Sequence, residues 1–146
     1  MNLDKVQEFV ALDHGLATVS VARSDGSVLS SVVNAGVMDH PVDGGRVVAM
    51  VVRGSAFKLR RWREHPSASV VFRAGWQWVG VEGKVAMFGP VDPMDGIDSS
   101  KLPTVLREVF KAAGGTHDDW DEYDRVMSEE GRRAVFVAPK RVLGSQ

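Results

Sequence analysis

The sequence contains no cysteine, which excludes disulfide bonds and thiolate metal ligands. No apolar run approaches the roughly 18 residues that a membrane-spanning helix needs, and no basic stretch precedes an apolar one at the N-terminus. The net charge is only −1 at pH 7, so the chain has no bulk attraction for nucleic acid or an anionic membrane. We therefore expect a cytoplasmic protein whose partners include no membrane and no nucleic acid.

Apolar residues, by contrast, are plentiful. They make up 44% of the 146 residues, and 25% of the residues are charged, a balance typical of a globular chain with a sizeable core. The length is that of one ordinary domain, and the sequence shows no internal repeat, low-complexity tract or linker. The prediction is a single domain over residues 1–146.

Short β-branched runs separated by turn residues dominate the chain. Strands are predicted at residues 16–23, 28–37, 46–52, 67–72, 76–88 and 132–138. Helices are predicted at 2–12, from Ser55 to Pro66, at 102–113 and from Thr116 onward, with a tail from 139. Most connections are too short for the crossover helix that parallel strands need. The predicted fold class is mainly β with helices (α+β), a closed or half-closed antiparallel barrel of six strands.

The stretch RVVAMVVRGSAFKLRRWREHP, residues 46–66, contains the main functional signal. A valine-rich strand becomes a basic helix across Gly54, and a helix start offers unpaired N–H groups and the positive end of a dipole. Ser55 is placed to cap the first turn, and Arg53 and Lys58 to lean toward it. We interpret this arrangement as a phosphate-binding site, although the spacing is not that of a Walker loop. The alternative is a basic helix that is only a solvated face.

Polar and aromatic residues on two predicted strands are further ligand candidates. Ser30 and Ser31 suit hydrogen bonding better than nucleophilic attack, because no G-x-S-x-G motif is present; alternatively, one of them simply faces solvent. Trp76 and Trp78 are two residues apart on one strand and are expected to point the same way. Such a pair is core, the wall of a flat ligand site or a dimer interface. With the phosphate site, these residues indicate a flat, phosphorylated ligand.

The titratable residues give no metal signal. The histidines His14, His40, His65 and His117 lack metal-ligand spacing, and no metal site is predicted. His65 precedes Pro66 and is expected to end a helix, where a cation suits the dipole. The acidic run at 118–124 is interpreted as helix-start charge and a solvated face.

Four segments carry a resemblance to a known family, and together they span almost the whole chain. The chain resembles the split-barrel flavin-reductase-like superfamily, which includes pyridoxamine-phosphate oxidase. Within it, the chain is similar to the F420-dependent oxidoreductases of actinobacteria, the B class of the flavin/deazaflavin oxidoreductases. The segments are residues 16–37, 53–66, 75–90 and 114–142. The last two are specific, whereas the strand–helix segment is shared with FMN-binding relatives.

The resemblance implies a split β-barrel that forms a homodimer, with the cofactor in a groove between subunits. In such relatives the motif that falls on Arg53, Gly54, Ser55 and Lys58 holds the cofactor phosphate. The strand that carries Ser30, Ser31, Val33 and Asn34 runs beside the deazaflavin ring. Aromatic residues of the partner subunit, corresponding to Trp76 and Trp78, help to wall the pocket.

The sequence departs from the family pattern at the phosphate motif. Relatives usually read R-G-G-T-R-K-L-R-N-L, and this chain has Ser55, Ala56 and Phe57 where Gly-Thr-Arg is usual. Each lost charge-assisted hydrogen bond is expected to weaken phosphate binding by about 1.5–3 kcal/mol. Ser55 supplies a hydroxyl from one position earlier.

The resulting expectation is an F420-dependent oxidoreductase that transfers a hydride from reduced deazaflavin to an unsaturated small-molecule substrate. The cofactor carries the chemistry and the protein positions it, so no indispensable catalytic side chain is predicted. Three alternatives remain open: FMN as the cofactor, a non-catalytic protein that binds F420 or haem, and nucleic-acid contact through residues 58–63. The sequence does not name the substrate.

Overall fold

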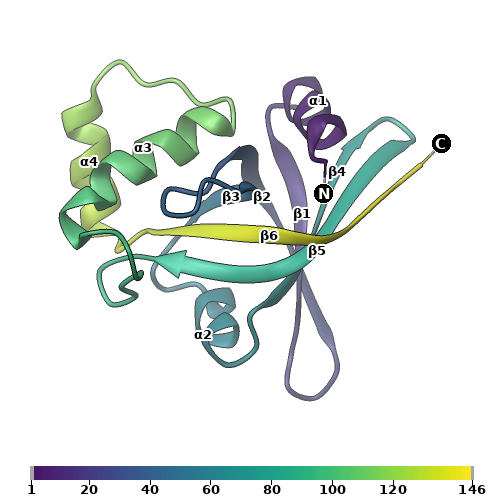
Figure 1. The fold of residues 1–146 in the computed structure, drawn as a ribbon, viewed down its shortest axis with the longest axis horizontal. Helices are drawn as coiled ribbons and strands as arrows, with labels where there is room; N and C mark the ends of the chain where they lie inside the picture. The colour runs from purple at the N-terminus through teal and green to yellow at the C-terminus, as the bar shows by residue number, and fades with distance from the viewer. Residues whose placement is uncertain (1, 146) are drawn as a thin grey trace.

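A computed structural model describes residues 2–145 and shows six antiparallel strands closed into a barrel. The strands are β1 (Leu16–Ala22), β2 (Val28–Asp39), β3 (Arg46–Val52), β4 (Ser67–Ala74), β5 (Gln77–Phe88) and β6 (Arg133–Gly144). Their order around the barrel is β1-β2-β3-β6-β5-β4 (Figure 1). The predicted fold class, mainly β with helices and six antiparallel strands, is confirmed.

Turn chemistry sets the first hairpin, between β1 and β2. Gly26 has φ 88°, a left-handed conformation that favours glycine. The Asp25 carboxylate accepts hydrogen bonds from the backbone N–H of Ser27 at 2.9 Å and from its hydroxyl at 2.6 Å. This turn fixes the register in which Ala22 lies opposite Val28 and Ser20 opposite Ser30.

The valine-rich strand β3 is apolar because both of its faces are covered. Val48, Met50 and Val52 point into the barrel core, whereas Val47 and Ala49 belong to a second core outside the barrel wall. In the first half of β6, alternate side chains likewise point into the barrel core and into the second core. The predicted valine-rich strand is therefore confirmed, and the run has no polar alternation because it has no solvated face.

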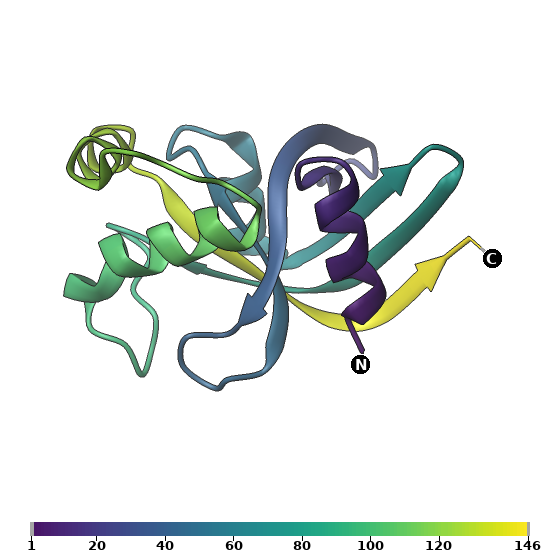
Figure 2. The ribbon, with the colours of Figure 1, turned by 90° about the horizontal axis from the view of Figure 1, so that it is seen from above.

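The helices cover the barrel on different sides. They are α1 (Asp4–Leu12), α2 (Phe57–Glu64), α3 (Leu102–Ala112) and α4 (Trp120–Glu129), with a short 3-10 turn η1 (Ser99–Lys101). α1 and α2 contribute apolar side chains to the barrel core and lie on opposite sides of the strands in Figure 1. α3 and α4 gather at one end, away from the β4–β5 hairpin (Figure 2). Trp62 of α2 points inward and is 1% exposed.

A glycine lets α3 lie directly on the sheet. A Cβ atom added at Gly36 of β2 would stand 2.1 Å from the carbonyl oxygen of Ala112 at the end of α3. No side chain fits there, so the close contact between α3 and β2 depends on this residue.

Two predicted boundaries were wrong by the widest margins. Residues 139–144 are not a tail but the second half of β6, which pairs with β5 from Val79 to Glu82. Pro139 is tolerated within this strand because it lies opposite Gly83, where the register shifts in a bulge. The last helix begins at Trp120 rather than near Thr116, because the Asp119 carboxylate caps it by accepting from the N–H of Glu122 at 3.1 Å.

Among residues 2–145, no helix combines the length and the apolar composition that crossing a membrane would require.

Candidate functional site

The corner between β3 and α2 holds the residues predicted to bind phosphate. Arg53, Gly54 and Ser55 follow the end of β3, and Lys58 lies in the first turn of α2. The prediction that Ser55 caps this helix was wrong, because Ala56 occupies the N-cap position and no side chain caps the turn. The structure therefore leaves the helix start without a side-chain acceptor, and Ser55 lies one residue too early to supply one.

Lys58 meets one of the predicted serines. Its ammonium donates a hydrogen bond to the Ser31 hydroxyl at 2.9 Å, although the residues are 27 positions apart. Nearby ion pairs use Arg53, Arg61 and Arg63, and none within residues 2–145 uses Lys58. Burial lowers the pKa of Lys58 because desolvation disfavours the charged form. A half-buried cation that lacks a carboxylate partner is well suited to receive an anionic ligand group.

Arg53 and Gly54 instead contact the turn that follows α4. The Arg53 guanidinium lies 3.1 Å from the Glu130 carboxylate, and the Gly54 N–H donates to the Glu130 carbonyl at 3.2 Å. A Cβ atom at Gly54 would stand 2.6 Å from the carbonyl oxygen of Gly131, so this glycine permits close backbone packing. A phosphate bound to Arg53 would have to replace or share the Glu130 carboxylate.

A salt-bridge network holds this corner in place. Asp92, in the loop after β5, accepts two hydrogen bonds from Arg63 of α2, at 2.9 and 2.8 Å, and one from Arg133 of β6 at 2.9 Å. The Arg133 side chain is 8% exposed, and its guanidinium also donates to the Gly131 carbonyl. The Arg63 and Arg133 hydrogen bonds lower the pKa of Asp92. Asp92 thus joins α2 to the turn that contacts Gly54.

The predicted ring-contacting residues of β2 divide between two faces, as strand alternation requires. Ser31 faces Lys58, and Val33 packs against the barrel core. Ser30 lies on the opposite, exposed face, where its hydroxyl is 2.9 Å from that of Ser20. Asn34 is on the same outer face and donates to the carbonyls of His14 at 2.6 Å and Ala113 at 3.3 Å. One planar ring lying against this strand reaches one of these faces, not both.

The two tryptophans lie far from Lys58 within the chain. Trp76 is in the β4–β5 turn rather than on a strand and is 98% exposed. Trp78 is 38% exposed, and its ring lies close above Gly80, where an added Cβ would be 3.4 Å from it. The β4–β5 turn and α2 are well separated in Figure 1. Within one subunit, these side chains cannot wall a pocket built on Lys58.

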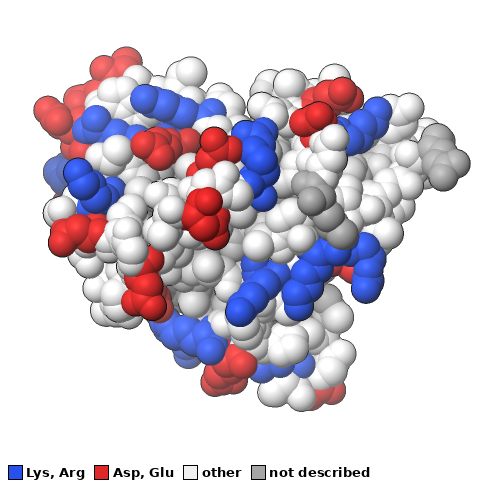
Figure 3. Space-filling model, viewed as in Figure 1, with Lys and Arg blue, Asp and Glu red and all other residues white. Residues whose placement is uncertain are grey.

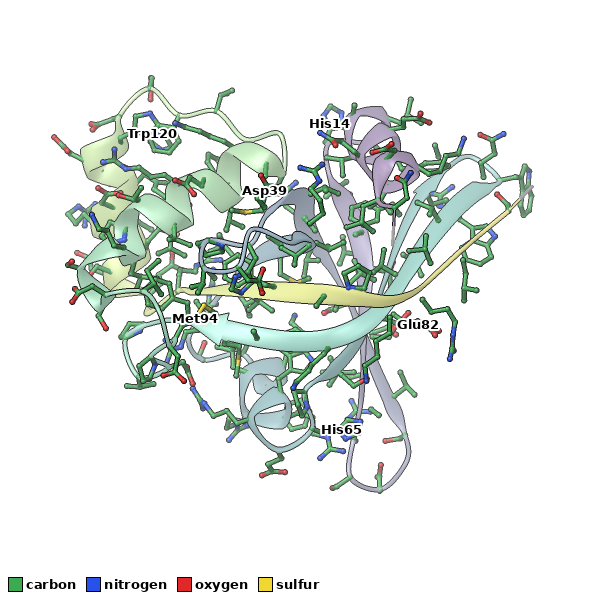
Figure 4. All side chains as sticks on the ribbon, viewed as in Figure 1. His14, Asp39, His65, Glu82, Met94 and Trp120 are labelled. Carbon is green, nitrogen blue, oxygen red and sulfur yellow. The ribbon has the colours of Figure 1, made fainter. Side chains whose placement is uncertain are left out.

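The histidines do not converge. Figure 4 shows His14 beside α1 and His65 beneath the barrel at the end of α2. His65 is the C-cap residue of that helix, which confirms the prediction that it ends there. No group of three or more histidine, aspartate or glutamate side chains within residues 2–145 is arranged to hold a metal ion.

Charges of both signs are interspersed on the face shown in Figure 3. Even in the basic run of α2, Arg61 pairs with Glu64 and Arg63 with Asp92. Of the described cations in the run, only exposed Arg60 and half-buried Lys58 have no ion pair, and Lys58 is the one that contacts a predicted ligand-binding residue.

Sequence reasoning missed the two residues that flank the turn after α4, Glu130 and Arg132. Glu130 lies within ion-pair distance of both Arg53 and Arg132. Arg132 also lines a cavity at Asn34. The segment E-E-G-R-R at 129–133 was visible as a charged turn, but nothing local indicates that it reaches the β3–α2 corner, more than 70 positions earlier in the chain.

No family model matches the sequence. The fold is nevertheless shared with solved structures. A conserved hypothetical protein from Mycobacterium tuberculosis superposes with a TM-score of 0.68 at 16% identity, over 99% of this chain and 84% of that one. A pyridoxamine 5′-phosphate oxidase-related, FMN-binding protein from Nostoc punctiforme gives 0.67 at 7% identity, over 99% and 84%. A protein described as an F420 reductase gives 0.60 at 13% identity, over 93% and 94%. The chain shares its split-barrel fold with these proteins.

Proposed function

We propose, from this split-barrel fold and the charge at its β3–α2 corner, that the protein is an oxidoreductase that uses a flavin-type cofactor, with F420 favoured over FMN. The observation that supports the proposal most directly is Lys58, a half-buried cation bonded only to a serine hydroxyl. The preference for F420 comes from the sequence resemblance, since FMN-binding and F420-associated proteins share the fold.

In this proposal each residue of the corner has a binding role. Lys58 neutralises the cofactor phosphate and the Ser31 hydroxyl adds a hydrogen bond. Arg53 contributes charge when Glu130 releases it, and the uncapped first turn of α2 offers N–H groups. A reduced deazaflavin, when bound, supplies a hydride for an unsaturated substrate. No acid–base side chain is assigned, because the protein's part is to hold and orient the reactants.

The proposed active form is a homodimer, supported by a bare apolar stripe on the barrel. Registers place Leu143, Gly80, Val71, Thr18 and Val32 side by side across β6, β5, β4, β1 and β2. Val32 is 68% exposed and Leu143 42%, and Leu16 and Trp78 flank this row. α3 and α4 cover the other side of the barrel wall, where β3 and β6 are lined by apolar residues. A second copy would bury the stripe and bring another subunit's tryptophans toward the corner.

The test is titration of the purified, cofactor-free protein with F420 and with FMN, followed through tryptophan emission. We expect saturable quenching with F420, and oxidation of reduced F420 by members of a panel of quinones and enones. Quenching by FMN and not by F420 would identify FMN, instead of F420, as the cofactor. Binding of F420 with no turnover across the panel would indicate a protein that holds the cofactor without catalysis, and binding of neither would refute the proposal.

A further inference from the structure

A cavity of about 220 Å³ lies between the α3–α4 pair and the outer face of β2 and β3. Its apolar lining includes Val51, Val109, Phe110 and Met127, and exposed Asn34 stands at its edge. A second cavity of about 100 Å³ adjoins it and shares Met127 and Arg132. Small-molecule sites typically measure about 300–1,000 Å³, which the two spaces reach only when joined. Met127, an unbranched and flexible side chain, is suited to move aside and join them.

Arg132, one of the residues that line the larger cavity, has a hydrogen-bond donor that is unused. Arg132 Nε is buried and has no hydrogen-bond partner among the described residues. The amide of Asn34 is already engaged by two carbonyls, and the Tyr123 hydroxyl donates to the Leu106 carbonyl at 3.0 Å. A water molecule needs two to four polar partners to be held well. Around the cavity it would find few, because the Asn34 and Tyr123 groups are occupied and the other walls are apolar, and Arg132 Nε is buried rather than open to the cavity in this conformation.

The ionised side chains that cluster around Glu130 at the edge of the larger cavity carry a net positive charge. Glu130 lies 3.1 Å from Arg53 and 3.2 Å from Arg132, so one carboxylate serves two guanidinium groups. Burial raises the pKa of Tyr123 to about 12, which keeps that phenol neutral at physiological pH. Among the described residues, Arg132 is therefore the one charged side chain that lines the larger cavity, and its charge is only partly balanced. The smaller cavity is also lined by Asp124, whose charge is paired with Arg107 at 2.6 Å. An anionic group on a ligand would complete the balance.

We propose that this cavity binds a small apolar carboxylate. The Arg132 guanidinium turns so that its unpaired Nε faces the cavity and donates a hydrogen bond to the carboxylate, and the hydrocarbon part lies against Val109, Phe110 and Met127. The proposal concerns binding and goes beyond the redox function, because none of these residues belongs to the Lys58 corner. Glu130 links the lysine corner to the cavity, because it contacts both Arg53 and Arg132, and Asn34 at the edge of the cavity is also a predicted ring contact.

The probe for the test is 4-fluorocinnamate, added to the full chain without any redox cofactor and followed by fluorine NMR. We expect saturable line broadening with the acid and much less with the neutral 4-fluorocinnamamide. Arg132→Gln should weaken binding of the acid about tenfold or more, because it removes a charge-assisted hydrogen bond. The matched control Arg125→Gln, an exposed arginine on α4, should bind as the wild type does.

A second measurement uses the unaltered chain, so it does not depend on whether a variant folds. The methyl signal of Met127 should shift as the acid is added. No broadening at millimolar acid, equal binding of acid and amide, or an unmoved Met127 signal would each overturn the proposal. Because no cofactor is present, a negative result here leaves the proposed oxidoreductase function standing, and a negative cofactor titration leaves this site standing.

Discussion

At the scale of single residues, the contribution of a cation to binding an anionic ligand depends on which groups already contact that cation. Arg53 and Lys58 look equivalent in the sequence, five positions apart beside one glycine. In the structure Arg53 is 62% exposed and paired with Glu130, whereas Lys58 is half-buried and bonded to a neutral hydroxyl. The desolvated, unpaired ammonium gains more from an incoming anion than the paired guanidinium does.

Lys58→Ala is therefore expected to weaken cofactor binding by about 1.5–3 kcal/mol, the usual contribution of a hydrogen bond to a charged group. Binding is measured by the same fluorescence titration. Arg60→Ala is the matched control, because Arg60 lies two positions away on the exposed side of α2 and should bind the cofactor unchanged. Equal affinity of the Lys58 variant and the wild type would remove Lys58 from the site.

At the scale of elements, the β3–α2 corner is held by contacts from distant parts of the chain. Asp92 ties α2 to β6 through Arg63 and Arg133, and the turn after α4 packs against Gly54. Arg133 is nearly buried, so its charge depends on Asp92 for compensation. The corner therefore keeps its shape only while these ion pairs persist.

Asp92→Ala should lower the free energy of unfolding by about 3–5 kcal/mol at pH 7, because it leaves a buried guanidinium without its partner. The pKa of Asp92 is held below its usual value of 3.8, so this contribution is present above that value and is lost as pH falls through the lower, folded-state pKa. Urea unfolding of both proteins between pH 7 and pH 3 measures it. The stability gap should narrow at the acid end.

The control for this experiment is Asp95→Ala, which changes an exposed aspartate in the same loop. It should leave stability within about 0.5 kcal/mol of the wild type, as surface substitutions usually do. A similar loss in both variants, or a gap that stays constant with pH, would show that the Asp92 network does not stabilise the corner.

At the scale of the whole molecule, one side of the barrel wall is covered and the other is bare. α3 and α4 pack over β3 and the first half of β6, whereas no segment within residues 2–145 covers the stripe from Leu143 to Val32. The β4–β5 turn is also well separated from α2, which carries Lys58. A pocket that uses both Lys58 and the tryptophans has to be built from two copies.

Val32→Glu should convert a dimer into a monomer, because a charge would be buried at the centre of the proposed interface. Light scattering after size exclusion should give twice the 15.9 kDa chain mass for the wild type and one chain mass for the variant. Val91→Glu, a change at an equally exposed valine in the loop after β5, should remain dimeric. A wild-type protein that is monomeric at tens of micromolar would refute the proposed interface.

The sequence by itself determined the elements and the class of fold. Valine-rich runs, the Asp25-Gly26 turn and short connections are local signals, and local signals are enough to predict antiparallel strands and the hairpin of β1 and β2. It also predicted that Ser31 and Lys58 belong to one site, through resemblance rather than spacing. The second half of β6 was not predicted, because Pro139 argues against a strand and the glycine and bulge that accommodate it lie on another strand.

Only the tertiary structure decided which of the candidate residues are available to a ligand. Closure of the barrel brings Glu130 to Arg53, Asp92 to Arg133 and Lys58 to Ser31, and each pair is separated by 27 or more positions in the sequence. Whether a charge is paired, buried or free is a property of such contacts. A sequence pattern names the charged residues, but the fold sets the partners, and the partners set the energy that a ligand can gain.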